Sequence, residues 1–299
     1  MPHTSAAHTR ALRARRACTG EPHQVVSTSM TRVSGSQQAI PPAATAAQQE
    51  LEAHVLLALR DIRQLRNHDL PFYPFRYVTP KSHSLELSLL PHHLGSFAFG
   101  MAPRSHDNEI AGVPGLRVTS SRRGITLRLL SRDGHPTDAN VLLKDVTPTQ
   151  WSKAMSWTND EYVGTTQDFF VHEPALTATE SQYLRQYERL RAHPMLASLV
   201  LRRLHLLSAA GWIDVWTADS AIKIEWFEGP QLREVARRLI DPDVGLVAEG
   251  VSLRRYHHEL INSDLEPYSL DFRGPAPQTG GTVSGRGYPE GALIMRRTD

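Results

Sequence analysis

The stretch GWIDVWTADSAIKIEWFEG, residues 211–229, contains two apolar runs on either side of a polar segment. Apolar and charged residues alternate in both runs, as IDV at 213–215 and as IKIE at 222–225. A period of two is typical of strands that bury one face. Residues 217–220 have the composition of a turn. The stretch therefore predicts a β-hairpin.

Two predicted helices precede this hairpin. The first covers about 180–192, and Thr177 and Glu180 form a capping box at its start. Pro194 ends it, and an apolar helix follows over about 195–210. Two helices followed by a hairpin resemble a winged-helix domain, whose helix enters a DNA groove beside the hairpin. The arginines that would contact phosphates are Arg185, Arg189, Arg191, Arg202 and Arg203.

The N-terminal half of the chain predicts a sheet with covering helices. An apolar stripe at helical spacing indicates a helix over 46–68, and Thr147, Pro148 and Gln150 mark the start of another. Alternating runs between residues 83 and 146 indicate several strands, including a hairpin that turns at Gly124. The fold class is therefore α+β: an antiparallel sheet with covering helices, followed by a helical region that carries a β-hairpin.

Composition divides the chain into four segments. Residues 1–49 are poor in hydrophobic periodicity and predict a disordered basic segment. We assign 50–175 to an α+β sheet domain and 176–272 to a helical domain with the hairpin, with one shared core as the alternative. Residues 273–299 are rich in glycine and proline at first and predict a flexible tail.

The charge of the protein is uneven along the chain. The net charge is +2, but residues 1–49 contain five arginines and one acid, Glu21, which leaves 28 basic and 30 acidic residues elsewhere. The body therefore lacks a global basic footprint for nucleic acid. The Arg-rich start also fits an organellar transit segment over 1–30, and Met30 offers an alternative start of translation. No apolar run is long enough to span a membrane, so we expect a cytoplasmic protein without membrane contact.

Known catalytic and metal-binding motifs are not found. The hairpin has the order Lys-x-Glu at 223–225, whereas a metal-dependent nuclease core needs an acid two residues before the lysine. His257 and His258 are adjacent and diverge on a helix, so they do not share an ion easily. Cys18 is the only cysteine, which excludes an intramolecular disulfide and a cysteine-based zinc site. We therefore expect no cofactor and no metal.

These observations favour a non-enzymatic binding or regulatory protein whose partner is a protein or a nucleic acid, with DNA contacted through residues 180–228. Two alternatives remain. One is an interaction or structural component that docks through the aromatic strip at 72–77, with Phe72 and Tyr73 foremost. The other is an enzyme whose site assembles only in three dimensions, from His172, Glu173, Asp214, Glu225, His257 and His258.

Overall fold

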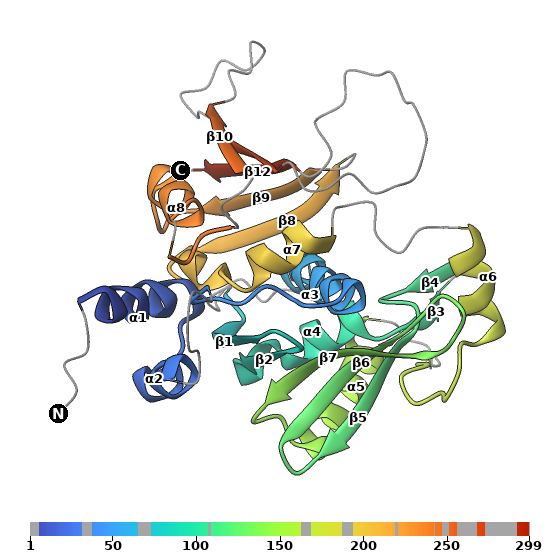
Figure 1. The fold of residues 1–299 in the computed structure, drawn as a ribbon. Helices are drawn as coiled ribbons and strands as arrows, with labels where there is room; N and C mark the ends of the chain where they lie inside the picture. The colour runs from blue at the N-terminus through green and yellow to red at the C-terminus, as the bar shows by residue number, and fades with distance from the viewer. Residues whose placement is uncertain are drawn as a thin grey trace.

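The computed structural model has two five-stranded sheets with helices between and around them (Figure 1). Helices and mixed sheets together confirm the predicted α+β class. The residues that the structure describes are 6–31, 38–64, 73–106, 109–162, 169–186, 194–218, 221–241, 243–246, 251–255, 268–272 and 292–298.

The first sheet has the strand order β1-β2-β7-β6-β5. The pair β2–β7 is parallel, and the other neighbours are antiparallel. Its strands are β1 (Phe75–Lys81), β2 (Ser84–Leu89), β5 (Leu116–Ser121), β6 (Gly124–Leu130) and β7 (Pro136–Lys144). The helices that accompany it are α3 (Ala46–Gln64), the short η1 (Pro91–His93), α4 (Leu94–Met101) and α5 (Pro148–Tyr162). A separate ribbon is formed by β3 (Arg104–His106) and β4 (Glu109–Ala111).

Both predicted capping boxes are present. At the start of α5, the backbone N–H of Thr147 donates to Gln150 Oε1 at 2.8 Å, and the N–H of Gln150 donates to Thr147 Oγ1 at 3.2 Å. Thr177 and Glu180 exchange the same two bonds at 2.9 and 3.1 Å at the start of α6 (Ala178–Gln186). Local side-chain chemistry therefore sets where these helices begin.

The second sheet has the order β10-β11-β12-β9-β8. Here β9 and β12 are parallel, and the other neighbours are antiparallel. Its strands are β8 (Trp212–Ala218), β9 (Ala221–Phe227), β10 (Val251–Arg255), β11 (Tyr268–Phe272) and β12 (Ala292–Thr298). The helices beside it are α7 (Pro194–Leu201), the 3₁₀ turn η2 (Leu204–Leu207) and α8 (Leu232–Leu239).

The two sheets are copies of one arrangement. The order of the corresponding elements is α3, β1, β2, α4, β5, β6, β7 in the first sheet and α7, β8, β9, α8, β10, β11, β12 in the second. In each sheet, the last strand pairs in parallel with the second strand of the hairpin. The registers also agree. The turns are closed by the pairs Lys81–Ser84 and Ala218–Ala221, and the parallel pairing begins one residue later at Leu85–Val141 and Ile222–Leu293. The chain therefore contains an internal structural repeat.

The leading helices of the two repeats, α3 and α7, pack against each other between the sheets (Figure 1). Buried apolar residues from both sheets and from both helices form one continuous cluster, from Leu51 to Met295. The described part of the two halves thus shares a hydrophobic core.

The predicted hairpin exists, but it does not form a wing. Strands β8 and β9 pair antiparallel, with Val215 opposite Ile224. However, β9 also pairs along its other edge with β12, so the hairpin is built into a sheet and does not project from a small domain. The winged-helix resemblance is not supported, because it rested on chain order and a distant strand completes the sheet.

Both ends of the chain also differ from their predictions. Residues predicted to be disordered form α1 (Ala6–Thr19) and α2 (His23–Thr31). The end of the predicted flexible tail forms β12, a central strand. In each case contacts with distant parts of the chain decide the local structure, and a local pattern does not contain them.

Candidate anion-binding cleft

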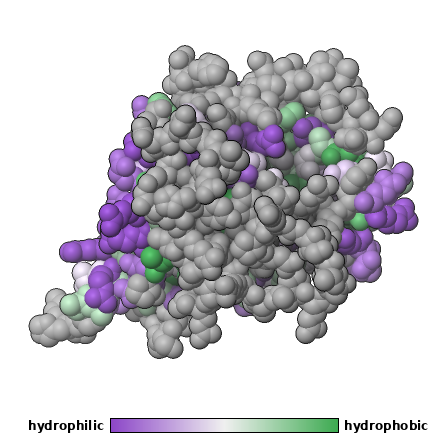
Figure 2. All heavy atoms as spheres, turned by 90° about the horizontal axis from the view of Figure 1, so that it is seen from above, coloured by the Kyte–Doolittle hydropathy of each residue, from purple (hydrophilic) through white to green (hydrophobic). Residues whose placement is uncertain are grey.

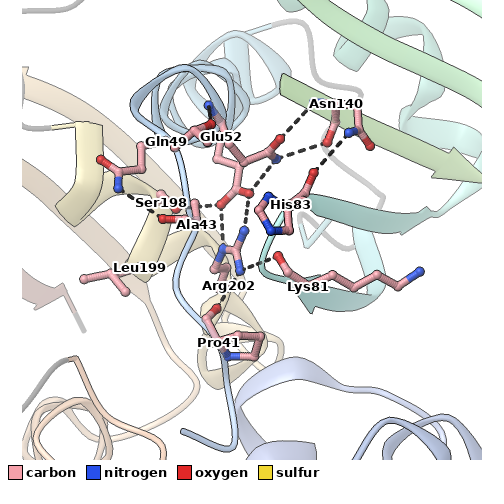
Figure 3. A network of polar contacts seen from close by, with 12 residues as sticks. Pro41, Ala43, Gln49, Glu52, Lys81, His83, Asn140, Ser198, Leu199 and Arg202 are labelled. Atoms are coloured by element: carbon pink, nitrogen blue, oxygen red, sulfur yellow. Dashed lines mark hydrogen bonds and ion pairs between the residues drawn. The ribbon is translucent and has the colours of Figure 1, made fainter. Parts of the chain in front are cut away.

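Arg202, which the sequence predicts to contact phosphates, lies in the centre of the protein. Its side chain is 0 % exposed. Its Nε donates to Glu52 Oε2 at 2.7 Å, its Nη2 donates to Glu52 Oε1 at 2.5 Å, and its Nη1 donates to the carbonyl oxygens of Pro41 and Lys81 (Figure 3). Every nitrogen of this guanidinium is thus occupied by the protein, so Arg202 does not face a ligand.

The acceptor of this arginine is itself held on several sides. Glu52 belongs to α3, and it also accepts hydrogen bonds from Ser198 Oγ at 2.6 Å and from Gln48 Nε2 at 2.8 Å (Figure 3). The Gln48 amide also binds the backbone of Asn140 on β7: its Nε2 donates to the Asn140 carbonyl at 3.0 Å, and its Oε1 accepts from the Asn140 N–H at 2.8 Å. The network joins α3 of the first repeat to α7 and Arg202 of the second. Its role is to fix the two repeats together.

Arg203 is also buried, and it holds a turn of the chain. It donates to the carbonyl oxygens of Val244, Gly245 and Leu199 at 2.5, 2.6 and 2.9 Å. Burial is the main cause that lowers its pKa to about 10; the nearby Arg202 acts in the same direction and Cys18 in the opposite one. Arg203 therefore positions the turn that follows α8, and it is buried where the sequence predicted an exposed arginine that contacts phosphates.

Of the three remaining predicted arginines, the structure describes Arg185 alone. Arg185 is exposed on α6, at the right-hand edge of Figure 1. Arg189 and Arg191 lie outside the described residues. The sequence suggested one face because these arginines follow each other along the chain, but Arg202 and Arg203 are turned into the core.

The described residues of the enzyme alternative lie in two separate places. His172 and Glu173 line a cavity of about 330 Å³ beside β5 and β6. Asp214 on β8 lies opposite Glu225 on β9 in the second sheet. His257 and His258 lie outside the described residues. Within the part of the chain that the structure describes, no group of three or more His, Cys, Asp or Glu side chains could hold a metal ion.

The aromatic strip packs inward. Tyr73 and Phe75 are buried, and their rings meet edge to face with centroids 6.0 Å apart. Burial raises the pKa of the Tyr73 hydroxyl far above its usual range. Phe72 lies outside the described residues. The strip therefore belongs to the core at Tyr73 and Phe75, which does not suit the predicted docking role.

A site that the sequence did not predict lies where α1 meets the second repeat. Arg15 is 2 % exposed and binds the Glu21 carboxylate with two nitrogens, at 2.7 and 2.9 Å. Its Nη1 also donates to the Ala39 carbonyl at 2.7 Å. A small apolar cluster of Ala14, Cys18, Ala39, Ile40 and Val244 packs beside this clamp. Together these contacts fix α1 as a wall.

The opposite wall is α8, and a cleft of about 610 Å³ separates the two helices. Hydrophilic side chains gather on this side of the molecule, at the left of Figure 2. The lining residues are Ala6, Thr9, Arg10, Arg13, Ala14, Arg237, Arg238 and Asp241. Each helix thus contributes two guanidinium groups, and the lining carries a single carboxylate.

The acids near the cleft leave an excess of positive charge. Arg10 Nε lies 3.0 Å from Asp243 Oδ2, and the Arg10 side chain is 71 % exposed. An ion pair as exposed as this contributes little to stability. An incoming anion can therefore compete with Asp243 for Arg10, while Arg13 and Arg237 remain exposed to solvent.

The internal repeat shows how unusual this surface of α8 is. The equivalent helix of the first repeat, α4, has the sequence LGSFAFGM and packs against both α3 and α5. In α8 the inner face is apolar, with Val235, Ala236 and Leu239 buried, whereas Arg233 and Arg237 are exposed. The same position in the fold therefore makes an apolar helix contact in one repeat and presents arginines in the other.

No protein-family model, curated protein or solved structure matches this chain. Among the described residues, no helix is both long enough and apolar enough to cross a bilayer. One signal in the sequence pointed toward the cleft, namely the concentration of arginines near the N-terminus. Nothing local indicated that α1 and α8 would face each other.

Proposed function

We propose that this protein is a non-enzymatic binding protein that holds a phosphate-bearing partner in the cleft between α1 and α8. The observation that carries the proposal is the convergence of Arg10, Arg13, Arg237 and Arg238 from two helices on one cavity. Arginine presents a planar fork of donors that matches the oxygens of a phosphate, and it stays charged at physiological pH.

The construction of the walls supports this reading. The folded structure holds like charges opposite each other across the cleft. The buried Arg15–Glu21 pair and Arg203 keep the two walls in position. Like charges held together disfavour the empty state, so a site of this kind gains from an anion that neutralises it. We place the protein in the cytoplasm as part of the same proposal, because its one cysteine is a free, buried thiol.

The experiment is a binding titration with three fluorescent phosphate-bearing probes: a nucleoside triphosphate, a single-stranded oligonucleotide and a duplex. We expect at least one probe to bind saturably and more weakly as salt is raised. Arg13→Gln should weaken that binding. Arg16→Gln is the matched control, because Arg16 is exposed on the same helix but does not line the cleft.

Two results would overturn the proposal. One is that none of the three probes binds at low salt. The other is that Arg16→Gln weakens binding as much as Arg13→Gln, since binding would then follow the charge of α1 and not the cleft.

A further inference from the structure

The cleft also indicates which phosphate-bearing ligand it takes. Resting on the function proposed above, we infer that the ligand is a compact oligophosphate, a chain of two or more directly linked phosphates such as a nucleoside diphosphate or triphosphate carries. The inference depends on three properties of the cleft: its volume, the arrangement of its charges and the chemistry of the rest of its lining.

The volume fits a small ligand. A cavity of about 610 Å³ lies within the range of sites for small molecules and cofactors. A nucleic-acid duplex offers its phosphates on a convex cylinder, and proteins meet it with a helix or strand that projects into a groove. The duplex is therefore the wrong shape for a concave cleft between two helices.

The charges favour linked phosphates over a single one. Arg10 and Arg13 lie on one wall, Arg237 and Arg238 lie on the other, and Asp241 is the one acid among the described lining residues. A single phosphate has four oxygens and a charge of only about two near neutral pH, so it neither accepts a bidentate fork from each of four guanidinium groups nor neutralises them. Linked phosphates place several charged groups within the span of one cleft, and their total charge of three or four suits four arginines and one acid.

The described lining has no aromatic side chain on which a base could stack. Besides the charged groups, the described lining contains Ala6, Thr9 and Ala14, and none of its residues is aromatic. Proteins that bind single-stranded nucleic acid stack its bases on aromatic side chains. This cleft therefore recognises the phosphate chain and not the base, and it gives a flexible polynucleotide no advantage over a free oligophosphate.

The test is isothermal titration of the full chain with inorganic tripolyphosphate, orthophosphate and a nucleoside triphosphate. We expect tripolyphosphate to bind at least about tenfold more tightly than orthophosphate, and the nucleoside triphosphate to match tripolyphosphate within about threefold. Arg237→Gln should weaken the binding of tripolyphosphate by about tenfold or more. Arg233→Gln, an exposed arginine on the same helix outside the cleft, should leave it unchanged.

The outcomes separate this inference from the function on which it rests. If an oligonucleotide binds through the cleft and tripolyphosphate does not displace it, the inference fails and the proposed function stands. If a nucleoside triphosphate binds far more tightly than tripolyphosphate, the base is recognised and the inference is again overturned. If no phosphate-bearing probe binds, both fail. Thermal melting of each variant shows that it is folded, so that a loss of binding is not a loss of structure.

Discussion

Removal of the charge of Glu52 should destabilise the whole protein, because this carboxylate joins the two repeats. The Glu52 and Arg202 side chains are both 0 % exposed, and Glu52 accepts hydrogen bonds from Arg202, Ser198 and Gln48. Glu52→Gln leaves the Arg202 guanidinium buried without a counter-ion, which costs about 3–5 kcal/mol. Native proteins are stable by only about 5–15 kcal/mol, so the variant should lose at least about a fifth of its stability, and all of it if the protein is at the low end of that range.

The assay is urea unfolding followed by circular dichroism, in a double-mutant cycle. Arg202→Met alone leaves the Glu52 carboxylate buried and should cost a similar amount, whereas Glu52→Gln combined with Arg202→Met removes both charges and should cost clearly less than the sum of the two single changes. Glu50→Gln is the matched control on the same helix, and it should change the free energy of unfolding by under about 1 kcal/mol. A Glu52→Gln variant as stable as this control would refute the reasoning.

Three further predictions concern other parts of the fold. Burial raises the pKa of the Glu180 carboxyl, but bonds from Arg117, Thr177 and Gly115 outweigh it and hold that pKa below its ordinary value of 4.5. The free energy of unfolding should therefore fall as the pH is lowered from about 4.5 through the pKa of the folded carboxyl, and Glu180→Gln should remove that part of the acid sensitivity in pH-dependent urea unfolding. Cys18 is buried, and burial raises the pKa of its thiol to about 11 although Arg203 and Arg238 act in the opposite direction. A thiol reagent should therefore label Cys18 only after α1 detaches from the rest of the protein. Immediate labelling of the native protein would show that residues 6–31 are not docked. Gly229→Ala should lower the melting temperature more than Gly134→Ala, because both glycines have positive φ but a Cβ at Gly229 would lie 2.7 Å from the Ala210 nitrogen, whereas at Gly134 the nearest atom is 3.6 Å away; equal losses would contradict the role of that close contact.

The elements with strong local signals were predictable from the sequence. The stripe in α3, the capping boxes before α5 and α6 and the hairpin of β8 and β9 depend on residues within a few positions of each other. Their side-chain periods and caps bias the backbone before any tertiary contact forms. The α+β class followed from these elements alone.

Contacts between distant segments were not predictable in the same way. The repeat is hidden because equivalent positions such as Leu85 and Ile222, or Val141 and Leu293, share only their burial. The sequence of β12 predicts part of a flexible tail, because its strand partners β9 and β11 are distant in the chain.

Arginine was the residue whose role the sequence concealed most. Arg202 and Arg203 look like surface cations but are buried, each with acceptors supplied by distant parts of the chain. Arg10 and Arg13 look like part of a disordered arm but line a cleft. Whether an arginine binds the protein or a ligand depends on which acceptors the fold brings to it, and one stretch of sequence does not contain that information.

We propose that α1 and α8 together form one anion-binding site. A comparison of two doubly substituted proteins tests whether both helices contribute. Arg13→Gln with Arg237→Gln removes one guanidinium from each wall of the cleft, and Arg16→Gln with Arg233→Gln removes the same charge from the same helices outside it. The account predicts that tripolyphosphate binding is lost in the first protein and kept in the second. Equal affinity in the two proteins would contradict it.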